Sequence, residues 1–466
     1  MTPVSRRLLL VSVLITVLLS CAATVRGQET APKARRPMID VAATGVLQVS
    51  TEGFIEERLV IPQAVSSQLK QIAIGESLRL AGWPVSPGYH RTIRVKRISV
   101  YAPGASIIEI GKQGEHSVPR SIHRHFVGAV EGETDSRVLV ILDPANGLLT
   151  GLALSGGLSY DLAPVDGENP HRVRVVATRE RVAESDPMWD CAEVNQTAVP
   201  IPGGAVHTTA ISKAGGPLEA VLAIETDTEL MSQKFGGSTL AATDYIADLI
   251  AAMNVMYSRD LNISLLQGTT YLRTASDPYV VNSNGAVSSA ELSEFGSYWK
   301  SNYGSVDRAL VAMLSGKSIS NNSASGRAWV GGLCSNNYGY SFSKVFKINY
   351  LSGDAKLVGH EIGHNFGSPH THCYNPPIDT CYSGGGSGCY NGATSCPGGP
   401  GTVMSYCHLT GCGSTLDFHP TTINHILNNY VAPATGVCIF EATPAGSLFD
   451  DDFEAGNTGA WSGSSP

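Results

Sequence analysis

The chain has 466 residues, of which 42% are hydrophobic and 15% are charged, so it has apolar material for two or three packed domains. The net charge is only −8 and no Lys/Arg-rich run occurs, which argues against a nucleic-acid partner. The 50 glycines indicate many turns and loops rather than long helices.

Residues 1–27 have the pattern of a signal peptide. Arg6 and Arg7 precede an almost wholly apolar run at residues 8–19. That run is too short for a membrane span and has the length of a signal-peptide core. We therefore expect a secreted, extracellular protein without stable membrane insertion. Two alternatives stay open: a retained membrane anchor, and a periplasmic or outer-membrane lipoprotein that is lipidated at Cys21.

Residues 28–205 are predicted to form a β-rich domain, because short apolar runs alternate there with Gly, Pro and Asp. The clearest strand candidates are residues 93–100, 106–110, 138–142 and 148–154. Residues 197–217 are poor in large apolar side chains, which indicates a linker or a processing region.

Residues 206–440 alternate between strand and helix patterns, as expected for an α+β domain. Strands are predicted at residues 220–224, 261–266, 309–314, 328–333 and 345–350, and helices at 239–257, 288–298, 354–366 and 421–430. Ser238 is the expected N-cap of the first of these helices. Residues 441–466 form an acidic tail rich in Gly and Ser. Its aspartates 450–452 offer oxygen ligands to calcium, but a solvated acidic tail is the favoured interpretation.

The cysteines cluster near the end of the chain. Eight of the ten lie in its last third, namely Cys334, Cys373, Cys381, Cys389, Cys396, Cys407, Cys412 and Cys438. An even set in an exported chain predicts up to four disulfides, and the sequence leaves their pairing open. Cys191 is left over, in a long stretch without another cysteine.

One motif in the predicted helix 354–366 carries chemistry. His360 and His364 are four residues apart, so both imidazoles lie on one helix face, one turn apart. Gly367 can end the helix in a left-handed conformation, which lets His370 approach the same metal ion. Three neutral nitrogen ligands with one open position are typical of catalytic zinc sites. Glu361 would then take the proton of a zinc-bound water as that water attacks a carbonyl.

The segment His360–His370 has the form His-Glu-x-x-His-x-x-Gly-x-x-His and therefore resembles the metzincin peptidases. The resemblance implies a methionine turn beneath the metal, for which Met404 is the candidate. Within the metzincins the chain looks most like the reprolysin (adamalysin) branch, in a bacterial-looking version. Residues 326–334 resemble the edge strand that pairs with extended substrate in that branch. Residues 125–164 resemble its propeptide.

Two departures from the reprolysin pattern concern the site. Thr371 stands where an Asp is usual, and Tyr406 stands where a Pro is usual. Tyr406 resembles the tyrosine of astacins and serralysins, so one hypothesis makes it an extra zinc ligand or an oxyanion donor; the alternative is a packed tyrosine. Cys191, just before the predicted boundary, is a candidate latency switch whose thiolate would occupy the open position on zinc. The alternative is an inert cysteine.

These observations predict a latent proenzyme. It would consist of a signal peptide (1–27), a β-rich prodomain (28–205), a zinc metalloendopeptidase domain (206–440) with a twisted mixed sheet, and the tail (441–466). Zinc is the predicted cofactor, and protein or peptide chains are the predicted substrates. Two alternatives remain: a zinc-binding adhesion or inhibitor module without catalysis, and a metal-dependent amidohydrolase acting on non-peptide substrates.

Overall fold

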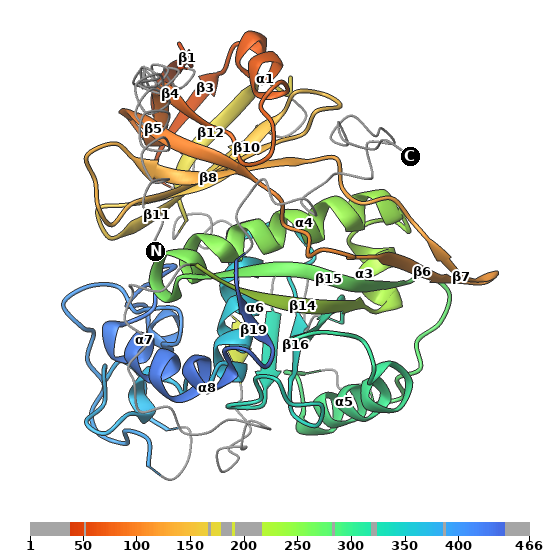
Figure 1. The fold of residues 1–466 in the computed structure, drawn as a ribbon. Coiled ribbons are helices and arrows are strands. Elements are labelled where there is room, and N and C mark those ends of the chain that lie inside the picture. The colour runs from red at the N-terminus through yellow and green to blue at the C-terminus, as the bar shows by residue number, and fades with distance from the viewer. Residues whose placement is uncertain are drawn as a thin grey trace, which may run out of the picture. The chain divides into compact units, whose positions relative to one another are not determined.

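The first of two β-sheets is built from the N-terminal part of the chain (Figure 1). Its ten strands follow the order β1-β4-β5-β8-β9-β10-β11-β12-β3-β2, and every neighbouring pair except β1 and β4 is antiparallel. Their bounds are β1 Met38–Asp40, β2 Thr44–Val49, β3 Ile55–Val60, β4 Ser77–Ser86, β5 Tyr89–Ile98, β8 Arg124–Val130, β9 Arg137–Leu142, β10 Leu149–Ser155, β11 Leu158–Pro164 and β12 Arg172–Ala177, with helix α1 at Gln63–Leu69. The expectation of a β-rich N-terminal region is confirmed.

The computed structural model describes residues 38–50, 53–165, 169–178, 189–191, 217–281, 285–317, 324–384 and 388–442. By their contacts, the described residues all belong to one compact unit. Within the described ranges, no helix is both long enough and apolar enough to cross a lipid bilayer. The signal-peptide candidate, Cys21 and the tail aspartates lie outside these ranges.

The second sheet is mixed and has nine strands in the order β13-β17-β18-β16-β14-β15-β6-β7, with β19 also paired to β14. Their bounds are β6 Ile107–Gly111, β7 Gly114–Ser117, β13 Trp189–Cys191, β14 Leu218–Thr226, β15 Ile263–Arg273, β16 Leu310–Ser315, β17 Ala324–Ala328, β18 Tyr340–Lys344 and β19 Ile439–Glu441. Three of these strands, β6, β7 and β13, come from residues before 205. The two sheets therefore do not divide the chain at that position.

Helices pack on both faces of the second sheet. Leu222 and Ile224 of β14 lie in a core shared with α4 (Thr239–Met256) and α6 (Leu351–Asn365), whereas Ala223 between them lies in a core shared with α5 (Ser289–Tyr303). The remaining helices are α3 Thr228–Gln233, α7 Pro420–Ile426 and α8 Ala432–Ala434. The predicted N-cap Ser238 accepts a hydrogen bond from the Ala241 amide, and Ser288 forms a capping box with Glu291.

Two predicted strands are wrong. Ala328 is the last residue of β17, and residues 329–333 form a turn, in which Gly331 has φ +73° and its amide donates to the carbonyl of His364 at the end of α6. Residues 345–350 form a loop after β18, in which the Phe346 amide donates to Asp354 Oδ1. Each run includes buried apolar residues, namely Leu333 in the first and Val345, Phe346 and Tyr350 in the second, and such residues do not by themselves distinguish a strand from a turn or loop.

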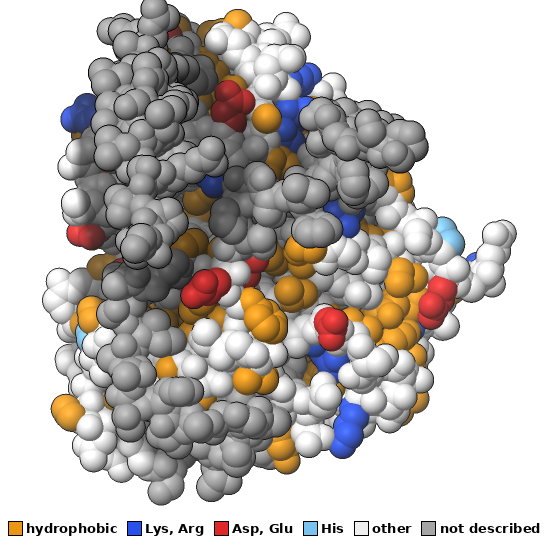
Figure 2. Space-filling model, in the orientation of Figure 1, with side chains coloured by type: hydrophobic (Ala, Val, Ile, Leu, Met, Phe, Trp, Pro, Cys, Tyr) orange, Lys and Arg blue, Asp and Glu red, His pale blue; other side chains and the backbone are white. Residues whose placement is uncertain are grey.

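Four disulfides join the eight C-terminal cysteines, as Cys334–Cys438, Cys373–Cys389, Cys381–Cys407 and Cys396–Cys412. The predicted number of bridges is confirmed. Three of the four tie together residues 373–412, a stretch with little regular structure of its own. On the face that Figure 2 shows, Lys and Arg side chains are interspersed with Asp and Glu, and no continuous basic patch covers the described residues.

Candidate metal centre

The three histidines of the motif converge on one point. His360 and His364 lie one turn apart on α6, and His370 follows the end of that helix. The Nε2 atom of His364 lies 3.1 Å from Nε2 of His360 and 3.1 Å from Nε2 of His370. All three side chains are buried. Such a cluster of nitrogen atoms has the spacing that a single metal ion requires.

A glycine brings His370 to the other two. Gly367 has φ +96°, and its amide donates to the His364 carbonyl, while the Ser368 amide donates to the Gly363 carbonyl. These bonds end the helix in a left-handed turn. A Cβ atom at Gly367 would collide with the Tyr430 ring, so only glycine fits here.

Two backbone carbonyls fix the orientation of the helical imidazoles. The Nδ1 atom of His360 donates to the Val403 carbonyl at 2.7 Å, and Nδ1 of His364 donates to the Ser368 carbonyl at 2.7 Å. With the proton held at Nδ1, the lone pair of Nε2 faces the centre of the cluster. Metal-ligating histidines are usually oriented in this way. The donor set therefore fits a metal ion.

Burial keeps these histidines neutral. It lowers the pKa of His360 and of His370 well below the usual range, and the pKa of His364 to about 4. The hydrogen bonds to Val403 and Ser368 oppose this effect only in part. Neutral imidazole is the form that binds metal.

Met404 packs against α6, the helix that carries His360 and His364. Its sulfur is so close to Gly363 that a Cβ atom there would lie 2.5 Å from Sδ. The Met404 carbonyl accepts a hydrogen bond of 3.1 Å from the Thr371 amide, next to His370. The side chain is fully buried. Met404 therefore packs under the cluster and holds the chain that carries His370.

Glu361 points toward strand β17. A Cβ atom at Gly326 of β17 would collide with its carboxylate, so this glycine leaves the space that Glu361 occupies. Glu361 is buried, and its charge adds to burial in raising the pKa of Tyr257 well above the usual value. The sequence places Gly326 in the edge-strand segment but does not reveal this contact, because the two residues meet only through the fold.

Tyr406 packs against the histidines. Its ring centroid lies 4.1 Å from that of His370, and its ring is nearly parallel to that of His360, 11° apart at 6.2 Å. Tyr382 approaches it edge-on at 4.9 Å between centroids. The ring is therefore part of the wall of the cluster, a position that both interpretations of Tyr406 require.

Two other groups of metal-binding side chains lie nearby in the described residues. One combines His370 and His372 with Cys373, and the other combines Asp379 with Cys381 and Cys407. All three cysteines are in disulfides, so they offer no thiolate. The three-histidine cluster is the set with a complete group of donors.

Comparison with known proteins agrees with this geometry. The reprolysin-type sequence model of Metallo-peptidase family M12 matches residues 219–416. Residues 219–416 therefore resemble an M12 metallopeptidase domain. Among solved structures, the crystal structure of metalloproteinase-II from Bacteroides fragilis matches with 13% identity and a TM-score of 0.35, and the match covers 66% of this chain and 85% of that chain. A search of curated proteins found no match.

The M12 metallopeptidases that this region resembles are metal-dependent enzymes that act on proteins, which agrees with the three-histidine cluster. The strand β13 lies beside the region that resembles M12. This strand runs parallel to β17 on the edge opposite β18, with Cys191 paired to Gly326. Cys191 is thus aligned with the glycine that makes room for Glu361 in the M12 domain.

The lowered pKa values predict how metal binding depends on pH. Protons compete with metal only near the folded-state pKa, so we expect zinc affinity to stay nearly constant from about pH 8 to about pH 6 and to fall steeply toward about pH 4. Exposed imidazoles with a pKa of about 6.5 would already lose affinity between about pH 7 and pH 6. Competition titration with a chromophoric chelator measures this profile.

The matched variants are His364→Ala, which should abolish tight binding, and His116→Ala, which should leave it unchanged. His116 lies on β7 with a side chain that is 54% exposed. Equal zinc affinity in His364→Ala and the unsubstituted protein would contradict the site.

Proposed function

We propose that this protein is a secreted, zinc-dependent endopeptidase that is made as a latent precursor and uses Glu361 as its general base. The observation that carries the proposal is the convergence of three neutral Nε2 atoms beside a buried Glu361, within an M12 domain. His360, His364 and His370 would hold zinc, since three imidazoles leave an open position.

Zinc in such a site lowers the pKa of a coordinated water to about 7 and polarises the carbonyl of the substrate. The residues of the chain do the rest. A Glu361 oxygen accepts the proton of the attacking water and then delivers it to the nitrogen of the leaving amine. The space beside Gly326 holds the carboxylate in one place, so little reorganisation is needed during proton transfer.

Strand β17 is the proposed substrate edge. Its inner edge pairs with β18 and its outer edge with β13. An extended peptide on the outer edge would gain main-chain hydrogen bonds and lie next to Glu361. In the precursor, β13 occupies that place, and the three histidines and Glu361 are buried. Both observations support latency, with Cys191 as the proposed switch residue.

Secretion is proposed from the signal-peptide pattern of residues 1–27 and is supported by the four disulfides, which persist in oxidising compartments. A metal-binding module without catalysis would not need a carboxylate buried at the cluster. Hydrolysis of casein but not of small non-peptide amides would separate the endopeptidase from an amidohydrolase.

Glu361→Gln tests the general base, because the amide keeps the shape of the side chain but cannot accept the proton. We expect zinc content to be unchanged and casein hydrolysis by the processed protein to fall at least about 100-fold. Metal analysis and an activity assay on the same preparation measure both. Full activity with the amide in place would overturn the mechanism.

Tyr406→Phe tests the tyrosine. If its hydroxyl stabilises the developing oxyanion, kcat should fall about 10- to 100-fold with little change in KM, since the ring that packs on His370 is retained. Steady-state kinetics of the processed protein separates the two constants. Unchanged turnover would leave Tyr406 a packing residue.

Cys191→Ser tests the latency switch in the unprocessed chain. Loss of the thiolate should give measurable peptidase activity without cleavage of the precursor, because serine is a far weaker zinc ligand. The control is the double variant with Glu361→Gln, which should stay inactive. A fully latent Cys191→Ser precursor would rule out the switch.

A further inference from the structure

We propose that residues 38–178 remain bound to the M12 domain as a noncovalent subunit after the connecting segment is cut. The inference rests on the proposed processing of the precursor but not on peptidase activity. It differs from the simple view that a prodomain dissociates from the catalytic domain after the precursor is cleaved. Its basis is that the two regions share a β-sheet, a hydrophobic core and two sets of polar contacts.

The shared sheet comes first. Hairpin β6–β7 continues the second sheet beyond β15, and β6 runs parallel to β15 from Ile107 opposite Thr270 to Ile110 opposite Arg273 (Figure 1). The chain before β6 adds further backbone bonds, since the Gln267 amide donates to the Val100 carbonyl at 2.7 Å. Removing residues 38–178 would leave this edge of β15 without its partners, a state that folded proteins avoid.

The shared core involves the back of the first sheet. Along β9, Val138, Val140 and Leu142 face the core of the N-terminal sheet itself, whereas Leu139 and Ile141 belong to the core that contains α4, α6 and β14. Strand β10 repeats the pattern, with Leu152 and Leu154 in the shared core. The central strands are therefore buried on both faces, and separation would expose apolar surface on both regions.

Polar contacts surround this apolar area. On α4, Asp244 and Asp248 lie one turn apart on one face. Asp248 accepts from His125 Nε2 at 2.8 Å and from His123 Nδ1 at 3.0 Å, and Asp244 accepts from Ser121 Oγ at 2.5 Å. Burial disfavours a charged His123, yet the neighbouring carboxylates raise its pKa, so the contact between His123 and Asp248 has ion-pair character.

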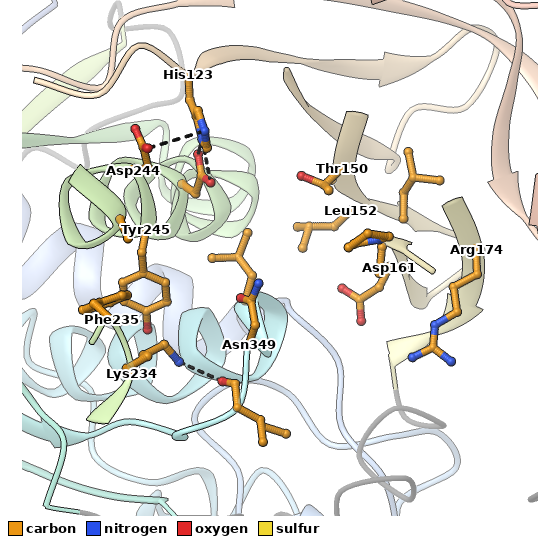
Figure 3. Close-up of a pocket in the computed structure, with 18 of the residues that line it drawn as sticks. His123, Thr150, Leu152, Asp161, Arg174, Lys234, Phe235, Asp244, Tyr245 and Asn349 are labelled. Atoms are coloured by element: carbon orange, nitrogen blue, oxygen red, sulfur yellow. Dashed lines mark hydrogen bonds and ion pairs between the residues drawn. The ribbon is translucent and has the colours of Figure 1, made fainter. Parts of the chain in front are cut away.

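A second set of contacts reaches the start of the metal helix. Ser352 Oγ donates to Asp161 Oδ2 at 2.9 Å, and Tyr350 OH donates to the Thr178 carbonyl at 3.2 Å. Between the two sets lies a cavity of about 810 Å³. Figure 3 shows His123, Asp161, Lys234 and Asn349 around it. The N-terminal region thus also supports the helix that carries the metal ligands.

In this arrangement the substrate edge can open without dissociation of the N-terminal region, whereas a prodomain that dissociates would do both at once. Among the described residues, the three residues of β13 are what pairs with the outer edge of β17, so their withdrawal would open the substrate edge. The contacts at β15, α4 and α6 all lie away from that edge and do not involve β13. The active form would then be a two-chain particle.

The test uses the full chain with Glu361→Gln, to prevent self-digestion, and a recognition sequence for an unrelated protease placed within residues 197–216. After cleavage, we expect size-exclusion chromatography with light scattering to show one particle with the mass of the uncut chain. Ile141→Asp, which places a charge in the shared core, should separate the two fragments. Val46→Asp, at a position that is 68% exposed on β2, should not.

Hydrogen exchange decides the question even if Ile141→Asp fails to fold. In the cleaved Glu361→Gln protein without Ile141→Asp, the amides of Gln267 and Thr270 should stay protected, because their acceptors are the carbonyls of Val100 and Ser106. The Leu265 amide, bonded to Asn254 inside the M12 domain, is the internal reference. Separation into two folded fragments, or loss of protection at Gln267 and Thr270 alone, would overturn the proposal, whatever the peptidase assay shows.

Discussion

The burial of three imidazoles around one point is the constraint on which the rest of the site depends. Buried polar nitrogen atoms are costly unless each has a partner. For His360 and His364, backbone carbonyls receive the Nδ1 protons, which leaves the Nε2 lone pairs for the metal. One of these carbonyls belongs to Val403, directly before Met404. The turn around Met404 therefore orients a ligand through its backbone as well as packing beneath it, and the disulfide Cys381–Cys407 holds the chain just after it.

Close packing around the histidines requires residues without side chains at three places. Gly363 admits the sulfur of Met404, Gly367 admits the ring of Tyr430 and takes a left-handed conformation, and Gly326 admits the carboxylate of Glu361. Each glycine thus lies where another element comes close to α6. A larger residue at any of them would displace the group that fills that space, because packed interiors have little room to relax.

The sequence predicts those parts of the site that depend on local spacing. His360, Glu361 and His364 lie within one helix, and Gly367 and His370 follow within six residues of it, so helix geometry alone relates them. Contacts between distant segments determine the rest. They give Gly326 its role, bring the carbonyls of Val403 and Ser368 to the histidines, and place β6 beside β15. Backbone carbonyls carry no side-chain signature, and a strand pattern does not name its partner. The same limit explains the errors at residues 328–333 and 345–350, where a short run with several apolar residues has the pattern of a buried strand.

Strand β17 connects the metal centre to the rest of the chain. Gly326 touches Glu361, and the turn that follows bonds to the end of α6 through Gly331 and Leu333. Asn365 at the end of α6 donates to the carbonyls of Trp329 and Tyr340, which ties the same turn to β18. A strand on the outer edge of β17 is therefore separated from Glu361, the proposed general base, by β17 alone. Occupation of that edge by β13 excludes a second strand from it, because each edge pairs with one partner, whereas the β6–β7 hairpin at the opposite end of the sheet can stay in place.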